Sequence, residues 1–429
     1  TPSLATGTGG FLESNYNVTY TAYTGTVDKK ALTVTAIGPA KEYGTALTAE
    51  TSTTNFTFSG TVGSETVTSV TLTPDAAGQS ATTAAGTTYT VTPSLAAGTG
   101  GFLGSNYNIT FTPYTGTVSK KVLTVTADNK SKTYDGSTFT AGGGTFSSTI
   151  TGFVNSDNAG VVIGSVTYTG DATSATVVGT YNDITPVVSG LNAANYSFSP
   201  VNGTLTIYPA APTGSSSQTL DYGTLLSNLS ANGSNIKWYK TSSGGSALDG
   251  TTLLVAGSTY YASQTVDGLE SINRLPVQVT LNGINASYYY PWNEVELPDN
   301  WSSPKSRGVL LTPDFNAGDG NVLGSGQAEN VAVLFTGYID IPYAGNWTFH
   351  ISSDDGSRLI IDNIEVIYND GLHSESEGNA ISELTSLTQG KHSIRIEYFE
   401  HTGSAMLNLM AEHSSFPLAP VPQNWFKLN

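Results

Sequence analysis

The chain has 429 residues, which is enough for three to five modules of ordinary size. It contains no cysteine, so disulfide bonds, a thiolate nucleophile and cysteine-ligated zinc are excluded. The net charge is −17 without a basic patch, which argues against nucleic acid as a partner, and no apolar run approaches the roughly 18 residues that membrane insertion requires.

The composition favours strands and turns over helices. Only 11% of the residues are charged, whereas Thr, Ser, Gly, Val and Tyr are abundant. We therefore predict an all-β chain of tandem β-sandwich-like modules. The same composition indicates an extracellular bacterial protein, at the cell surface or secreted, and we expect this chain to be a fragment of a longer one.

The N-terminal part of the chain repeats itself. Residues 1–36 return at residues 92–127 with 29 identical positions among 36, and residues 191–207 form a weaker third copy. A period near 90 residues is longer than a solenoid unit, so each copy should be a self-contained β-module. We divide this part into the closing strands of a truncated repeat and two whole modules, at residues 1–31, 32–121 and 122–209.

These repeats resemble the MBG and YDG families of bacterial surface-protein modules. The similar residues are the Tyr-Gly and Tyr-Asp-Gly starts at residues 43–44 and 134–136, and the Gly-Thr-Leu-Thr close at residues 203–206. The resemblance implies an MBG type with Tyr-Gly for residues 32–121 and a YDG type for residues 122–209. It also implies that both modules are extracellular spacers.

A Pro-, Ala- and Ser-rich linker at residues 209–217 leads into a small β-module at residues 210–281. Residues 236–240 predict a central strand with Trp238 in the core, and residues 258–264 predict a late strand. The module resembles bacterial immunoglobulin-like domains.

The last segment, residues 282–429, differs chemically from the rest. It holds 18 acidic side chains against six Lys and Arg, together with all five His and four of the five Trp. Short alternating segments such as residues 331–342 and 392–400 predict a β-sandwich or barrel.

The most informative feature is the acidic pair Asp354 and Asp355, between two apolar strand-like runs. Adjacent carboxylates repel each other unless a cation neutralises them, and Ca²⁺ accepts oxygen ligands in loose geometry. The alternative is a turn without metal, because Asp and Gly are common turn residues. We expect Asp362-Asn363 to be a hairpin turn, and the five His to be structural or surface groups since no close His spacing suggests zinc.

Four segments of residues 282–429 resemble the PA14 domain family: Phe-Thr-Gly-Tyr at 335–338, Gly-Asn-Trp-Thr-Phe at 345–349, Ser-Ser-Asp-Asp-Gly-Ser-Arg-Leu at 352–359 and Ile-Glu-Tyr-Phe-Glu at 396–400. The resemblance implies a β-barrel. In the lectin members of this family the Asp pair, joined by a cis peptide bond, binds Ca²⁺, and vicinal sugar hydroxyls complete the metal shell.

Carried over to this chain, the resemblance implies a metal site and a sugar site in two loops. The expected Ca²⁺ ligands are Asp354, Asp355, Glu400, His401 and Gly403. The expected sugar-binding residues are Asp354, Asp355, His401, Thr402 and Ser404. Trp292, Trp301 and Tyr398 are candidates for stacking on a sugar ring, and the loop at residues 369–373 is a further candidate for contact with the ligand.

The function expected from the sequence is Ca²⁺-dependent binding of cell-surface glycans or polysaccharides by a non-enzymatic, monomeric fragment of an adhesin. Two alternatives stay open. The chain could be a purely structural spacer, or the non-catalytic accessory region of a secreted glycosidase.

Overall fold

The computed structural model describes residues 1–374, 379–382 and 384–428, and it confirms the all-β prediction. The chain divides into two compact units. The first comprises residues 1–130, 138–175 and 180–205, and the second comprises residues 131–137, 176–179 and 206–429. Among the described residues, no helix has the length and apolar character needed to cross a bilayer.

The first repeat forms two small sheets around one core. β1 lies antiparallel to β3 and parallel to β6, and a second sheet has the order β2-β4-β5-β7. Alternating Thr and apolar residues explain this, because Leu32 and Val34 of β1 face the core while the intervening Thr33 is exposed. The elements are β1 (Lys30–Ala36), β2 (Glu50–Ser52), β3 (Phe56–Ser59), β4 (Thr66–Pro74), α1 (Ala76–Gln79), β5 (Thr88–Thr99), β6 (Tyr107–Thr112) and β7 (Tyr114–Thr117).

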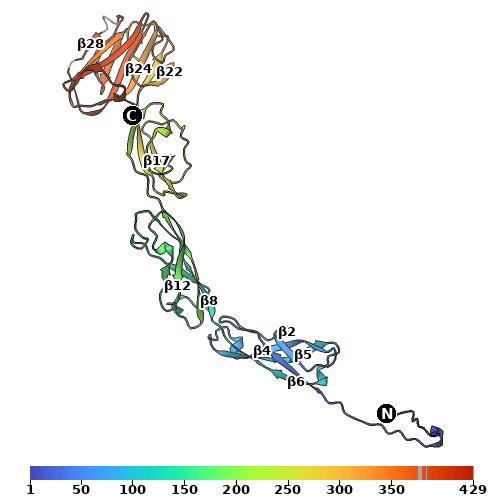
Figure 1. Cartoon of the computed structure of the whole chain (residues 1–429). Helices are drawn as coiled ribbons and strands as arrows, with labels where there is room; N and C mark the ends of the chain where they lie inside the picture. Colours follow the sequence, from blue (N-terminus) through green and yellow to red (C-terminus); the bar gives the residue numbers. More distant parts are fainter. Residues whose placement is uncertain (375–378, 383, 429) are drawn as a thin grey trace. The chain divides into compact units, whose positions relative to one another are not determined.

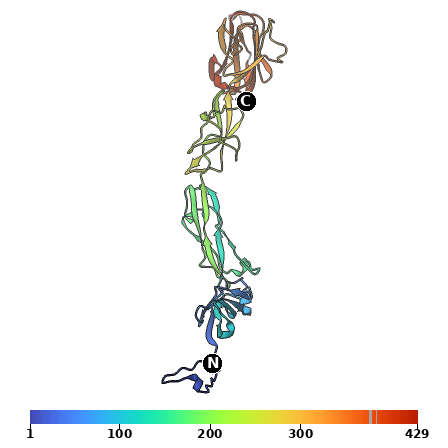
Figure 2. The ribbon, with the colours of Figure 1, turned by 90° about the vertical axis from the view of Figure 1, so that its right-hand side faces the viewer.

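Residues 1–29 do not form the closing strands that their sequence predicts. They contain one 3-10 turn, η1 (Glu13–Asn15), and no strand, and both Figure 1 and Figure 2 show them as dark-blue coil. The nearly identical residues 92–117 form strands because β4 and β1 offer them hydrogen-bonding partners. A strand needs such a partner, so the same sequence stays irregular here.

The second repeat begins with the same arrangement as the first. β8 lies between β10, which is antiparallel to it, and β13, which is parallel to it. The apolar core is continuous between the two repeats and includes Tyr43 and Tyr196. The strands are β8 (Lys121–Ala127), β9 (Lys130–Thr133), β10 (Ser148–Thr151), β11 (Thr167–Thr169), β12 (Gly179–Val187), β13 (Tyr196–Val201) and β14 (Gly203–Tyr208).

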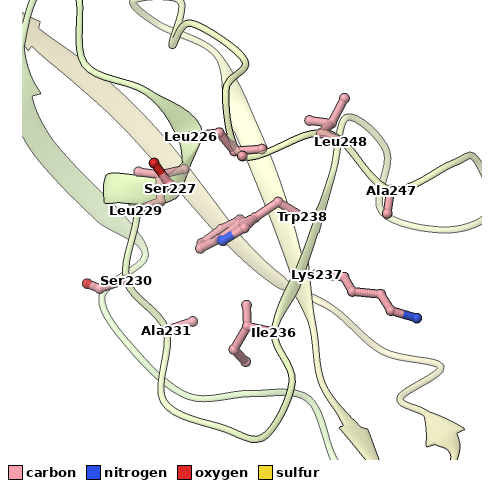
Figure 3. A pocket seen from close by; sticks show the side chains of 11 residues that line it. Leu226, Ser227, Leu229, Ser230, Ala231, Ile236, Lys237, Trp238, Ala247 and Leu248 are labelled. Atoms are coloured by element: carbon pink, nitrogen blue, oxygen red, sulfur yellow. The ribbon is translucent and has the colours of Figure 1, made fainter.

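The module at residues 210–281 has a small core around Trp238. The late strand predicted at residues 258–264 is confirmed as β17, but β16 lies at the edge of its sheet, so the prediction of a central strand is wrong. Trp238 is buried because the segment carrying Leu226 and Leu229 covers its indole (Figure 3), beside a hollow of about 410 Å³. The immunoglobulin-like assignment stays a prediction. The strands are β15 (Ser217–Asp221), β16 (Lys237–Tyr239), β17 (Thr259–Ser263), β18 (Thr265–Val266), β19 (Leu269–Glu270) and β20 (Leu275–Asn282).

The last module consists of two sheets that share one core (orange and red in Figure 1). One sheet contains β27-β26-β30-β24 with β21 and β22, and the other contains β23-β31-β25-β28 with β29 and β32. The resemblance to the PA14 family implies a barrel. The hydrogen bonds between the strands divide this module into two sheets that face each other across the core. The strands are β21 (Ile284–Tyr289), β22 (Ser306–Leu310), β23 (Phe315–Gly318), β24 (Val331–Ile341), β25 (Gly345–Asp354), β26 (Ser357–Ile361), β27 (Ile364–Asn369), β28 (Asn379–Ile381), β29 (Thr385–Leu387), β30 (Gly390–Glu400), β31 (Ala405–His413), β32 (Phe416–Pro420) and β33 (Phe426–Lys427).

A buried lysine joins the last two modules. β33 pairs with both β20 and β24, and the Nζ of Lys427 donates to Oδ1 of Asn282 at 2.6 Å. Asn282 in turn donates its Nδ2 to Oδ1 of Asp221 at 2.7 Å. Burial lowers the pKa of Lys427.

We expect Lys427→Met to lower the free energy of unfolding of the second unit by about 1–3 kcal/mol, because Asn282 then keeps a buried oxygen without its donor. Urea unfolding of the full chain measures this change. Lys305→Met, which removes a charge at an exposed position, is the matched control and should change stability by less than about 0.5 kcal/mol. Equal effects of the two variants would contradict the role given to Lys427.

Candidate metal and ligand site

Asp354 and Asp355 lie in the tight turn between β25 and β26. Asp354 is the last residue of β25, and β26 begins at Ser357. The peptide bond between the two Asp residues is cis, as the PA14 resemblance implied. A Cβ at Gly356 would lie 2.3 Å from the ring of Phe399 and 3.0 Å from Oδ1 of Asp370, so only glycine fits in this turn.

The register of β30 brings a third carboxylate to this turn. β30 pairs with β26 so that Tyr398 is opposite Ser357, and Glu400, the last residue of β30, follows two positions later. Carboxylate oxygens of Asp354, Asp355 and Glu400 lie within 4.8 Å of one another. Asp355 is 5% exposed and Glu400 is fully buried, so water compensates their charges poorly.

The electrostatics of Glu400 indicate a site with too much negative charge. Burial, and then the charges of Asp355 and Asp354, raise the pKa of Glu400 to about 8. Its Oε2 accepts a hydrogen bond from the hydroxyl of Tyr398 at 3.1 Å, whereas its buried Oε1 has no protein partner within the described part of the chain. A cation is the group that this set of oxygen donors fits, because it would supply the missing partner and cancel the repulsion.

Two loops hold the carboxylate of Asp355 in place. The backbone N–H of His373 donates to its Oδ1 at 3.1 Å, and that of His401 donates to its Oδ2 at 3.0 Å. The hydroxyl of Tyr398 also donates to the backbone carbonyl of Asp354. These contacts fix the orientation of the acidic pair before any ligand arrives.

The predicted residues of the second loop lie between β30 and β31, beside the acidic pair. The carbonyl of His401 accepts a hydrogen bond from the N–H of Asn330 at 3.0 Å, which occupies part of its capacity as a metal ligand. Thr402, Gly403 and Ser404 are exposed, and Ser404 donates its Oγ to Asp319 at 3.3 Å. The structure thus gathers the three carboxylates closely, whereas the metal and sugar roles of His401, Thr402, Gly403 and Ser404 stay predictions.

One of the three candidates for stacking on a sugar ring is wrong, and the loop at residues 369–373 contacts the acidic pair. Tyr398 is fully buried and so has no face for a sugar ring, because its side chain points into the core. Trp292 and Trp301 are partly exposed and pack beside Leu297. The sequence Asn-Asp-Gly-Leu-His at residues 369–373 lies against the site through His373, a contact between segments distant in sequence that only the fold reveals.

A second loop anchor also escaped the sequence analysis. Oδ1 of Asp370 accepts a hydrogen bond from the N–H of Leu297 at 2.8 Å, which ties the segment that contains Trp292 and Trp301 to the loop at residues 369–373. Asp362 and Asn363, by contrast, form the hairpin turn that was predicted, with φ of 50° and 63° between β26 and β27.

Comparison with known proteins identifies two families within the chain. The model of the PA14 domain matches residues 293–416, and that of the MBG domain (YGX type) matches residues 123–206. For the latter module the sequence analysis had assigned the YDG type on the basis of Tyr-Asp-Gly at residues 134–136. Its matching model is of the YGX type.

Individual proteins resemble the chain over about a third of its length. The anti-sigma-I factor RsgI3 of Acetivibrio thermocellus is 26% identical over 147 residues, which are 34% of this chain and 21% of that protein. The chain thus matches about a fifth of the length of this curated relative. A PA14 sugar-binding domain from an RTX adhesin is 16% identical over 34% of this chain and 99% of that one, with a TM-score of 0.30.

The epithelial adhesin 6 A domain of Candida glabrata, solved with Galβ1-3GlcNAc, is 15% identical over 34% of this chain and 87% of that one, with a TM-score of 0.27. By the family models, residues 293–416 match the PA14 domain and residues 123–206 match the MBG domain of the YGX type.

Proposed function

We propose that this chain is a Ca²⁺-dependent carbohydrate-binding part of an extracellular adhesin, with a glycan at the Asp354–Asp355 turn. The observation that carries the proposal is the buried group of three carboxylates, in which Oε1 of Glu400 has no protein partner in the described residues. The PA14 match over the same strands supports it. The upstream repeats then act as the stalk that presents the site.

In this proposal the ion is held by Asp354, Asp355 and Glu400. Ca²⁺ takes about six to eight oxygen ligands, so three carboxylates leave positions open. Neighbouring hydroxyls of a sugar fit such positions, and the metal gives a shallow site an affinity that hydrogen bonds alone would not reach. The backbone donors of His373 and His401 keep Asp355 oriented while the ligand exchanges.

The geometry favours binding over hydrolysis. Glycosidases place two carboxyl groups on opposite sides of the scissile bond, about 5–9 Å apart. Here three carboxylates converge within 4.8 Å of one another, which suits one cation between them. This geometry therefore supports a non-catalytic role for the site.

The expected result is binding to some glycans in Ca²⁺ and to none of them in EDTA. A glycan array probed with the full chain, followed by titration calorimetry on the hits in Ca²⁺, in Mg²⁺ and in EDTA, measures this. Titration calorimetry with Ca²⁺ alone gives the Kd of the ion. At a free Ca²⁺ concentration of 100 times this Kd, the free energy of unfolding of the second unit should rise by about 2.7 kcal/mol. Binding that is equal in Ca²⁺ and EDTA, or a chain that binds Ca²⁺ but no glycan, would contradict the proposal.

A further inference from the structure

The two repeats of the first unit meet through a Tyr-Gly loop. The hydroxyl of Tyr43 donates to Oδ2 of Asp157 at 3.0 Å, and its ring meets that of Tyr196 edge-to-face at 5.4 Å. Gly44 has φ +90°, and a Cβ there would come within 2.5 Å of Val154. The contact therefore requires a tyrosine followed by a residue without a side chain.

The receiving surface belongs to the second repeat, and we call Val154, Asp157 and Tyr196 its acceptor site. The hydroxyl of Tyr196 donates to Oδ2 of Asp157 at 2.8 Å and accepts from the N–H of Val154 at 3.1 Å. Asp157 thus accepts one hydroxyl from its own repeat and one from the neighbouring repeat.

Two polar contacts surround this acceptor site. Nζ of Lys121 lies 2.8 Å from Oε2 of Glu42, and Oδ1 of Asn195 accepts a hydrogen bond from the N–H of Ala85 at 3.0 Å. The loop therefore docks through one aromatic contact in the middle and through charge and amide contacts at the rim.

The first repeat carries the same acceptor site, formed by Val62, Glu65 and Tyr107. The N–H of Val62 donates to the hydroxyl of Tyr107 at 3.1 Å, and this hydroxyl donates to Oε2 of Glu65. The backbone matches as well: the N–H of Glu65 donates to the carbonyl of Val62, as the N–H of Asp157 does to that of Val154. The two acceptor sites agree down to individual hydrogen bonds.

The rim of the first acceptor site also matches, and it is exposed. Lys30 and Asn106 stand where the second repeat has Lys121 and Asn195, and Val62 is 54% exposed. One difference is Gly63, because its counterpart Asn155 donates to the carbonyl of Ala81 at 2.9 Å and glycine has no such amide. A docked loop would thus find the same kinds of polar partner apart from this amide, and at the centre it would meet Tyr107, which is 4% exposed and stacks on Phe102 at 5.3 Å.

The loop of the second repeat shows that the tyrosine is not buried by its own repeat. Tyr134, the counterpart of Tyr43, is 44% exposed, whereas Tyr43 is 5% exposed. The burial of Tyr43 therefore comes from the acceptor site that it contacts.

We propose that the acceptor site of Val62, Glu65 and Tyr107 binds the Tyr-Gly loop of a further repeat of the same type. Residues 1–29 repeat the sequence of residues 92–120, so they can tether such a repeat next to this site. A tethered loop docks at high effective concentration, and a contact of modest intrinsic strength then suffices. In the docked state Lys30 pairs with the glutamate of the further repeat that corresponds to Glu42. Glu65 accepts a hydrogen bond from the hydroxyl of the tyrosine that corresponds to Tyr43. This inference is independent of the acidic turn at Asp354.

The test uses a chain in which residues 1–29 are replaced by an added copy of residues 30–120. A water-soluble carbodiimide joins a carboxylate and an amine that are in contact, so it should link Glu42 to Lys121 at the existing junction. If the added copy docks, its Glu42 should also be linked to the Lys30 that follows it. Mass spectrometry distinguishes the two products because Ala31 follows one lysine and Val122 follows the other.

We expect the yields at the two junctions to agree within about threefold. Tyr43→Ser in the added copy alone should lower the yield at Lys30 at least fivefold and leave the yield at Lys121 unchanged, which makes the existing junction an internal control for folding. A strong product at Lys121 with less than a tenth of that yield at Lys30 would overturn the proposal. If neither junction reacts, the observed contact of Tyr43 is itself wrong, and the proposal fails with it.

Discussion

Asp355→Asn is expected to weaken Ca²⁺ binding by about 100-fold or more, since a loss near 3 kcal/mol corresponds to that factor and the change removes a charged ligand from a three-carboxylate site. Asp355 also accepts hydrogen bonds from His373 and His401, and an amide can accept only one of them. Titration calorimetry with Ca²⁺ on the full chain measures the affinity. Glycan binding in the presence of Ca²⁺ should be lost together with the binding of Ca²⁺.

Glu412→Gln is the matched control for this variant. Glu412 lies on β31, the strand next to β25, but at the end away from the acidic turn, and its side chain is 45% exposed. The control removes the same charge and should leave Ca²⁺ affinity within about twofold, because an exposed distant charge acts weakly through water. If Asp355→Asn keeps the affinity of the unmodified chain, Asp355 is not a ligand. If both variants lose affinity equally, overall charge is responsible and not the turn.

The second large effect concerns pH and Glu400. The pKa of Glu400 in the folded, metal-free chain is about 8, above the usual value of 4.5, so the folded state holds a proton that the unfolded state releases. Glu400 therefore contributes stability to the metal-free domain that is fully present below pH 4.5 and is lost as the pH rises to about 8. The slope from this one group is at most about 1.4 kcal/mol per pH unit. Ca²⁺ replaces the proton, so its affinity should rise over the same range, by up to tenfold per unit.

Glu400→Gln isolates this contribution. The variant should be more stable than the unmodified chain at pH 8 without metal, this advantage should shrink as the pH falls towards 5, and the variant should bind Ca²⁺ about 100-fold more weakly. Comparing the two chains is necessary because burial also raises the pKa of Asp314 to about 6. Urea unfolding at pH 5, 6.5 and 8, with and without Ca²⁺, provides the measurement. A difference in stability between the chains that stays constant from pH 5 to pH 8 would contradict the assignment of the proton to Glu400.

Some features of this protein could be predicted from single segments. The alternation at residues 331–342 and 392–400 predicted the strands β24 and β30, and Asp-Asn between two apolar runs predicted the hairpin at residues 362–363. The same local reasoning failed for residues 1–29, whose strand-like sequence has no partner strands. For residues 236–240 it succeeded in part: Trp238 lies in the core as predicted, but its strand is at the edge of the sheet, and its burial comes from a covering segment.

The candidate site was partly predictable for the same reason. Asp354 and Asp355 are adjacent, so their repulsion is visible in the sequence, and the family resemblance pointed to Glu400. The contribution of His373 was not visible, because it acts through its backbone N–H and lies 18 residues from Asp355. Tyr398 was misjudged because alternation suggests one exposed face, whereas the last five residues of β30 are all buried, so Tyr398 and Phe399 are covered on opposite faces of the strand.

By itself the sequence determined the all-β class, the repeats and the acidic turn, because composition, periodicity and adjacent charges are local properties. Only the tertiary structure decided that Glu400 approaches Asp354 and Asp355, that Asp355 is held by two separate loops, and that Tyr43 of one repeat occupies an acceptor site on the next. These depend on strand register and on contacts between distant segments, which arise only when the sheets have formed around a core.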